Sequence, residues 1–270
     1  MPKRYLFDPE TLQYYEIVGG RRRALPIASV AKDTVRLAVG ARAAMRALSV
    51  ELAKGRISLQ EWYDGMRREM KLSYYASVSV ARGKEPSDPL RAAEIAFLLW
   101  LLTRQFDYLD DFLDDIESGM PLDGRFVARA GMYGMATKSV FENWRLWTAR
   151  SNGWAEARRV LGFAEHCHDS NSRRGCEELA SLGWMPIVQM TPLGEATCLT
   201  NCQCTIEYRT KSKLAQEVTR LAATPSSSGE VRDEHGRLLF KYDPVSNTVE
   251  IKHKGMMRPK TVDLNRYKSE

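Results

Sequence analysis

The chain has 270 residues, of which 44% are hydrophobic and 27% charged, and its formal net charge is +6. These proportions are ordinary for a globular protein, and the length allows one large domain or two small ones. The basic balance permits contact with nucleic acid or an acidic partner without requiring either. The most apolar run, residues 95–102, is far shorter than the roughly 20 residues that span a bilayer. The N-terminus lacks the apolar segment of a secretory signal, so we expect a protein made in a cytoplasm, without membrane contact.

A β-hairpin is predicted at the N-terminus. Two short aromatic and β-branched runs within residues 3–18 flank the sequence DPET at 8–11, where Asp and Pro occupy turn positions that they favour. Two glycines then lead to three consecutive arginines, a pattern typical of a solvated linker. The same arginines are the candidate contacts for nucleic-acid phosphates, and they are Arg21, Arg22 and Arg23.

Two helices are expected to follow the arginines. Apolar residues recur at helical spacing over residues 28–54, and Gly55 fits the position just past a helix end. Ser58 and Glu61 have the spacing of a capping box, in which each side chain bonds the backbone of the other residue. This pair opens a second helix, which we expect to run to Ala81.

Two longer helices are expected next. The third is predicted over residues 89–118, with Ser87 or Asp88 as its cap and a proline at its first position. The fourth is predicted over residues 123–151, where methionines and aromatic residues indicate core packing. A short turn over residues 154–163 then leads out of the helical region.

The third helix carries a run of aspartates. Asp110, Asp111 and Asp114 match the DDxxD pattern by which isoprenoid synthases hold magnesium and diphosphate. No second acidic cluster, which such a site needs, occurs elsewhere in the sequence. The aspartates fall mostly off the apolar stripe that contains Leu109 and Leu113, so we interpret them as a solvated helix face. A metal-dependent enzyme using these aspartates stays an alternative.

A second hairpin is predicted near the C-terminus. A polar helix over 212–222 and a linker over 224–229 precede it. Its strands alternate in hydrophobicity over 238–242 and 249–251 around a turn at 243–247. The two terminal hairpins are alike in sequence, so we expect them to share a sheet or each to add strands to a neighbouring subunit.

All five cysteines lie within 38 consecutive residues, which indicates a cross-linked or metal-clamped segment. Zinc is usually held by four thiolate or imidazole ligands from two chain segments. A structural zinc, disulfide bonds and free thiols all remain open, although metal binding is the commoner use of such clusters in a cytoplasm. The candidate ligands, of which zinc would take four, are His166, Cys167, Cys176, Cys198, Cys202 and Cys204.

Nucleophilic catalysis is a further reading of the first cysteine. Cys167 lies between His166 and His168, but neighbours in sequence seldom adopt the geometry of a nucleophile and its base. The sequence contains no P-loop, dinucleotide-binding, HExxH or GxSxG motif. A thiol hydrolase is therefore kept only as an alternative, and we expect that the protein is not an enzyme.

The cysteine segment resembles the minor head proteins of tailed phages, the head-morphogenesis group related to the F protein of phage Mu. Upstream, the helix start at residues 55–66 resembles the same group, so the likeness covers about 41–208. One departure is the eight residues between the first two cysteines, where the family pattern has two. The residues that carry the resemblance are His166-Cys167, Cys176, Leu179-Ala180, Gly183-Trp184, Pro186, Gly194, Cys198, Asn201-Cys202, Cys204 and Tyr208.

The resemblance implies a structural virion protein, present in few copies near the portal inside the capsid. It would assist head assembly and DNA packaging or delivery, with the portal, major capsid or scaffold protein and packaged DNA as partners. An alternative is a cysteine-clamped nucleic-acid-binding module. That function would require the three arginines at 21–23 to converge with Arg173, Arg174 and Arg209.

The sequence as a whole predicts an α+β protein with a mainly helical body, a cysteine-rich irregular or β module and β-hairpins at both termini. The expected divisions are a hairpin and linker (1–24), a helical domain (25–164), the cysteine-rich module (165–210), a helix and linker (211–230) and the second hairpin (231–270).

Overall fold

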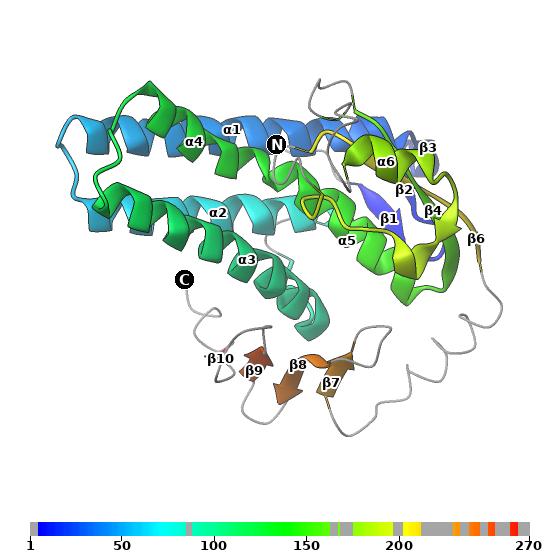
Figure 1. Ribbon diagram of the computed structural model, residues 1–270. Helices are drawn as coiled ribbons and strands as arrows, with labels where there is room; N and C mark the ends of the chain where they lie inside the picture. Colours follow the sequence, from blue (N-terminus) through cyan, green and yellow to red (C-terminus); the bar gives the residue numbers. More distant parts are fainter. Residues whose placement is uncertain are drawn as a thin grey trace.

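The computed structural model describes residues 5–84, 88–162, 167, 175–196, 202–211, 229–232, 238–243, 248–251 and 260–263, with side chains up to Arg209. The described chain has the predicted α+β fold, with a helical body and antiparallel sheets near both ends (Figure 1). No helix within these ranges is both long enough and apolar enough to cross a membrane. The predicted helix over 212–222 lies outside the described residues.

The body consists of long helices packed side by side (Figure 1). Helix α1 packs along α2 and α4, and α5 lies against both α1 and α2. Trp62, Phe112 and Phe126 form a cluster of mutual ring contacts in their shared core. In chain order the helices are α1 (Ile27–Ala53), α2 (Leu59–Arg82), α3 (Ala92–Glu117), α4 (Gly124–Met135) and α5 (Thr137–Ser151).

Helices α1 and α2 begin and end within one residue of the predicted positions. The capping box is present: the Glu61 N–H donates to Ser58 Oγ at 3.2 Å, and the Ser58 N–H donates to Glu61 Oε2 at 2.7 Å. Gly83 ends α2 with a φ of +67°, a conformation that favours glycine. A Cβ there would lie 2.7 Å from the carbonyl oxygen of Tyr5, so this glycine lets the N-terminal sheet approach α2.

The start of α3 differs from the prediction. The helix begins at Ala92, its cap is Arg91, and neither Asp88 nor Pro89 belongs to it. The Arg91 N–H donates to Glu94 Oε2 at 2.8 Å, and the same carboxylate pairs with buried Arg82 at 3.1 Å. The helix start is therefore fixed by a buried ion pair with α2, which a cap pattern does not reveal.

The predicted fourth helix is two helices, α4 and α5, which meet at Ala136. Gly134 explains the close fit of α4 on α1, because a Cβ on it would lie 2.3 Å from the backbone nitrogen of Arg42. The break lets α4 follow α1 while α5 turns toward the cysteine-rich module. Helical periodicity continues across the junction, so the sequence pattern does not show it.

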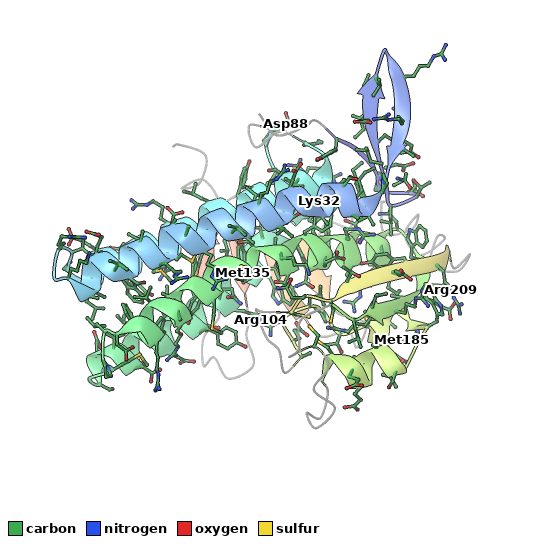
Figure 2. All side chains as sticks on the ribbon, turned by 90° about the horizontal axis from the view of Figure 1, so that it is seen from above. Lys32, Asp88, Arg104, Met135, Met185 and Arg209 are labelled. Atoms are coloured by element: carbon green, nitrogen blue, oxygen red, sulfur yellow. The ribbon has the colours of Figure 1, made fainter. Side chains whose placement is uncertain are left out.

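The N-terminal sheet has the order β1-β2-β3, formed by β1 (Leu6–Asp8), β2 (Gln13–Val18) and β3 (Arg21–Leu25). The first hairpin is confirmed, with Asp8 opposite Gln13. The prediction of a linker at the three arginines is wrong, because they form β3 and pair with β2 up to Val18 opposite Arg21. Figure 2 shows the β2–β3 hairpin extending away from the helices.

The C-terminal sheet has the order β10-β9-β8-β7. The second predicted hairpin is confirmed in β8 and β9, with Asp243 opposite Thr248. The two terminal hairpins belong to separate sheets, so the expectation of a shared sheet is wrong. The strands are β7 (Gly229–Arg232), β8 (Leu238–Asp243), β9 (Thr248–Ile251) and β10 (Lys260–Asp263).

The cysteine-rich module has its own sheet, in the order β5-β4-β6. Residues 154–160 form its central strand, which corrects the predicted turn. The pattern of alternating apolar and polar residues does not reveal this strand, because one of its inward positions is occupied by Arg159, which is 2% exposed. The elements are β4 (Trp154–Val160), α6 (Cys176–Ser181), β5 (Met185–Pro186), a short 3-10 helix η2 (Ile187–Gln189) and β6 (Thr205–Lys211).

Candidate metal centre

A second, smaller core lies beside the helical body and contains the described cysteines. Leu146 and Ala149 of α5 form its floor, and Ala157 of β4 and Ile206 of β6 pack against them. Ile187 also belongs to this core. The module is therefore packed directly on α5.

Four cysteines from three separated lengths of chain meet in this core. Cys167, Cys176, Cys202 and Cys204 are all buried and free of disulfide bonds. The Sγ atoms of Cys167, Cys176 and Cys204 all lie within 4.8 Å of one another, an arrangement that could hold a metal ion. The Sγ atom of Cys202 lies 3.6 Å from that of Cys176. We call these four residues the thiol cluster.

Two of the six predicted ligands, His166 and Cys198, lie outside the described residues. The long separation between Cys167 and Cys176 does not prevent these two cysteines from meeting. This agrees with the slow growth of loop-closure entropy with loop length. A disulfide between Cys176 and Cys202 is absent, because their 3.6 Å separation far exceeds the bonded S–S distance of about 2.05 Å.

Arg159 contacts the thiol cluster from β4. Its Nη1 donates to Cys176 Sγ at 3.6 Å and to Cys202 Sγ at 3.7 Å. Its Nη2 donates to the carbonyl oxygens of Thr191 at 2.6 Å and Pro192 at 3.4 Å. One buried guanidinium thus joins two cysteines to the segment after η2.

The environment of the cluster sets the chemistry of Cys204. Its hydrogen bond with Cys176 lowers the thiol pKa, but its hydrogen bond with Cys202, together with burial and the negative charge on Cys202, raises it more. The pKa of Cys204 is therefore raised to about 11, so without a bound metal ion this thiol keeps its proton at neutral pH. The backbone of Gly162 hydrogen-bonds Cys204 as well. Gly162 has no room for a side chain, because a Cβ would lie 2.4 Å from the carbonyl oxygen of Gln203.

Polar side chains of α5 hold the backbone of the module. Asn143 bonds Leu193 in both directions, from Nδ2 to the carbonyl oxygen and from the backbone N–H to Oδ1, each at 2.8 Å. Arg150 donates to the carbonyl oxygens of Ile187 at 3.2 Å and Met190 at 2.7 Å. These backbone groups lie in or just after the short η2 helix, where α5 supplies partners that a longer strand or helix would otherwise provide.

Lys138, at the start of α5, lies beside the cluster. Its Nζ donates to the carbonyl oxygen of Gln203, between two of the cysteines, at 2.6 Å. Burial lowers the pKa of this ammonium, while the charges of Glu142 and of the Cys202 and Cys204 thiols raise it. The net pKa shift is downward.

The outer face of the module sheet carries an aromatic and ionic ladder. Arg158 and Arg209 lie over the ring of Trp184 at 4.8 and 4.4 Å. Arg158 pairs with Glu207 at 2.6 Å, and Arg209 pairs with Glu156 at 2.9 Å. Of the further arginines expected to join a nucleic-acid-binding face, Arg209 is thus engaged in this ladder. The other two, Arg173 and Arg174, lie outside the described residues.

The aspartates of α3 do not form a comparable site. Asp110 accepts a hydrogen bond from the Tyr63 hydroxyl, and Asp115 pairs with Arg129 at 2.6 Å. Asp111 and Asp114 are exposed. Across the described residues, the three cysteines at 167, 176 and 204 are the only group of potential metal ligands that meet closely.

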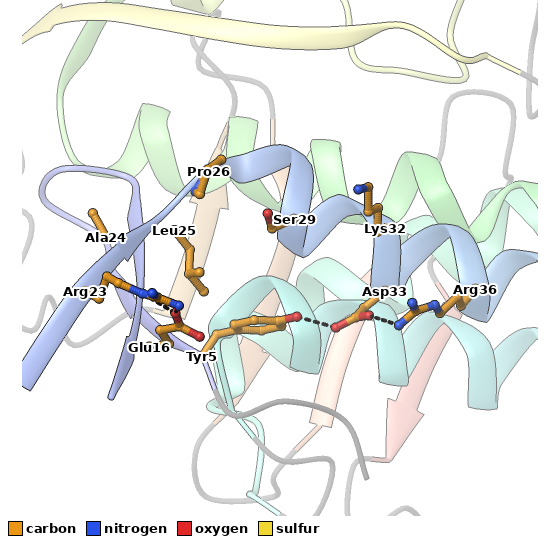
Figure 3. A pocket seen from close by; sticks show the side chains of 10 residues that line it. All are labelled: Tyr5, Glu16, Arg23, Ala24, Leu25, Pro26, Ser29, Lys32, Asp33 and Arg36. Carbon is orange, nitrogen blue, oxygen red and sulfur yellow. Dashed lines mark hydrogen bonds and ion pairs between the residues drawn. The ribbon is translucent and has the colours of Figure 1, made fainter. Parts of the chain in front are cut away.

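A cavity of about 510 Å³ lies between the N-terminal sheet and the start of α1 (Figure 3). Tyr5 donates to Asp33, which also accepts from Arg36 at 2.8 Å, and Arg23 pairs with Glu16 (Figure 3). Most charges lining the cavity neutralise one another, so it carries no clear preference for a ligand. Arg21 and Arg22 lie beyond it on the exposed part of β3.

The residues that sequence reasoning missed are those that support the cluster. Asn143 and Arg150 have no special sequence pattern, and Arg159 and Lys138 resemble ordinary surface charges. Only the packing of the module on α5 shows their roles.

Comparison of the chain with protein-family models, with curated proteins and with solved structures finds no match in any of the three.

Proposed function

We propose that this chain is a structural minor head protein of a tailed phage, acting near the portal in head assembly and DNA packaging or delivery. One observation supports the proposal most directly. Described residues of the cysteine motif gather in one module: Cys167, Cys176, Cys202 and Cys204 form the thiol cluster, Tyr208 packs against the same core, and Trp184 lies on the outer face of the module sheet. The motif thus corresponds to one built site.

We further propose that the thiol cluster binds one structural zinc ion. Tetrahedral zinc with Zn–S bonds of about 2.3 Å places its sulfurs about 3.8 Å apart. The 3.6 Å separation of Cys176 and Cys202 fits that spacing, and the sulfurs of Cys167, Cys176 and Cys204 lie within 4.8 Å of one another. Zinc would clamp a region that has only short helices and strands of its own.

No catalytic step belongs to this proposal. Cys167 is fully buried, where a substrate cannot reach its sulfur. A structural zinc site has all four positions filled by protein ligands, whereas a catalytic site keeps one position open. The burial of the cluster favours the closed arrangement.

Native mass spectrometry of protein purified under reducing conditions tests the zinc proposal. We expect a mass excess of one zinc ion, lost on chelation together with thermal stability. A metal-free mass with unchanged stability after chelation would contradict it. Oxidation of such a protein, with the loss of two hydrogens per bond formed, would indicate disulfides instead.

The virion role is tested separately, on particles of a phage that encodes this chain. We expect quantitative mass spectrometry of purified heads to find the chain in few copies relative to the major capsid protein. Crosslinking inside the particles should connect it to the portal. Absence of the chain from both mature heads and assembly intermediates would overturn the proposal.

A further inference from the structure

A buried cation, Arg159, contacts the thiol cluster without a carboxylate paired to it. Arg159 is 2% exposed, and within the described residues it forms no ion pair with a carboxylate. Its partners are the two sulfurs and two carbonyl oxygens described above, and its Nε–H has no partner in the described part of the chain. A buried cation of this kind is costly unless an anion lies beside it.

A second imbalance lies on α5. Glu142 pairs with Arg145 at 3.1 Å, and both side chains are almost fully buried. Glu142 is thus already paired. Lys138 approaches the cluster from the same helix, where its Nζ donates to the carbonyl oxygen of Gln203 at 2.6 Å, between Cys202 and Cys204 in the chain. Within the described residues, neither Arg159 nor Lys138 forms an ion pair with a carboxylate.

We propose that the thiol cluster is a tetrathiolate zinc centre with Cys202 as its fourth ligand, and that Arg159 and Lys138 are placed to neutralise it. The inference rests on the zinc site proposed above and specifies its ligands. Zinc binds cysteine as the thiolate, so four thiolates around a dication leave two negative charges. Arg159 and Lys138, which form no ion pair with a carboxylate in the described part of the chain, would offset those two charges.

Cys202 is connected to the three-cysteine group by two contacts. Its sulfur is at van der Waals distance from Cys176 Sγ, and Arg159 donates to both sulfurs from a single nitrogen. An N–H donor shared by two sulfurs is suited to thiolates that are held together by a metal, because charged acceptors form the stronger hydrogen bonds. A centre with a histidine as fourth ligand would carry one negative charge fewer and leave one buried cation unbalanced.

The ligand set is tested on the full-length holoprotein with zinc as the only added metal. Zinc-edge X-ray absorption should show four sulfur neighbours at about 2.3 Å and no nitrogen neighbour. Cys202→Ser should lose the bound zinc, whereas the matched variant Cys198→Ser should keep it. A sulfur–nitrogen mixture, or zinc loss from Cys198→Ser with retention by Cys202→Ser, would overturn the assignment.

The charge balance is tested with Arg159→Met, which keeps the length of the side chain and removes its charge. We expect its zinc affinity to fall about 10–100-fold in chelator competition, the range for loss of a group that supports metal ligands. Arg159→Lys should recover part of that loss. Lys138→Met should weaken zinc binding in the same direction.

Arg150→Met is the matched structural control, because Arg150 supports the same segment through backbone carbonyls. The readout is the gain in melting temperature when zinc is added to the metal-free protein. Arg159→Met should shrink that gain, while Arg150→Met should lower both melting temperatures and leave the gain unchanged. Equal effects of the two variants on the gain would refute the charge balance. Wild-type protein that takes up no zinc would instead refute the zinc site itself.

Discussion

Asn143 and Leu193 form a reciprocal pair of hydrogen bonds, in which one side-chain amide satisfies both backbone groups of a residue 50 positions away. Both residues are buried, so water cannot replace the amide. The pair fixes the chain just before the turn at Gly194 and holds it against α5. It shows how the helical body gives shape to a module that has few backbone hydrogen bonds of its own.

Asn143→Ala should therefore destabilise the protein by about 2–4 kcal/mol, because it leaves a buried donor and a buried acceptor of Leu193 without partners. Chemical denaturation monitored by tryptophan fluorescence measures the change. Asn152→Ala is the control, since the Asn152 amide bonds only the carbonyl oxygen of Thr148 at the end of the same helix. It should cost less than about 1 kcal/mol, and equal costs would contradict the role assigned to Asn143.

Gly162→Ala should destabilise the cysteine-rich module. Its Cβ would meet the carbonyl oxygen of Gln203 at 2.4 Å, and the strain of such overpacking is about 1–3 kcal/mol. Gly40→Ala makes the same chemical change in α1 with no atom within 4 Å of the new Cβ. It should stabilise the protein by about 0.5–1 kcal/mol. Opposite shifts in melting temperature are expected, and shifts of the same sign would show that the approach at Gly162 is not tight.

Acid should weaken the capping box of α2. The hydrogen bonds from the Ser58 backbone and side chain lower the pKa of Glu61 below its ordinary value of about 4.5. A carboxylate with a lowered folded-state pKa stabilises the fold above its unfolded pKa, and this contribution is lost as pH falls through the folded value. The stability difference between wild type and Glu61→Gln should thus be present at pH 6 and disappear toward pH 3.

Glu117→Gln, at the exposed end of α3, serves as the control for this pH profile. Parallel urea titrations across the pH range measure both differences. A Glu61→Gln difference that grows as the pH falls would contradict the capping-box assignment.

The basic strand β3 makes the predicted contact with nucleic acid testable. Arg21 and Arg22 are exposed near the end of the extended hairpin and form no ion pair within the described residues, unlike Arg23. If they contact DNA phosphates, the double variant R21Q/R22Q should reduce the slope of log affinity against log salt by about 2, from roughly 0.9 per contact. Fluorescence anisotropy with a labelled duplex measures this slope.

The double variant R68Q/R125Q removes the same charge from exposed positions on α2 and α4. It should leave the salt slope unchanged if the hairpin is the contact surface. The same loss from both variants would show that net charge alone attracts DNA, and no binding by the wild type would exclude the contact.

The first two helices and both terminal hairpins could be predicted because their signals are local. The capping box at Ser58 and the Asp-Pro turn at Asp8 act over a few residues and appear unchanged in the structure. Strand β4 could not be predicted, because inward-facing Arg159 breaks the alternation by which half-buried strands are found. The burial of Arg159 is explained by the sulfurs of Cys176 and Cys202, to which it donates hydrogen bonds.

The cysteines themselves were evident from their density, whereas the side chains that hold them were not. Lys138 and Arg150 look like the solvated residues of an amphipathic helix, yet they bond the backbone of chain that follows 37 or more residues later. A single sequence does not show which helix faces which module. The ligand set and its supporting residues therefore depend on tertiary structure.

The position of α5 before the cysteine-rich module has a consequence during synthesis. Every α5 side chain that braces the module precedes Cys167 in the chain and so leaves the ribosome before it, and about 50 residues separate the end of α5 from Cys204. At ~5–20 residues per second, that distance takes roughly 3–10 s. The α5 helix is thus available to the module before its last thiol appears, so metal capture would complete the module after the helix that braces it has emerged.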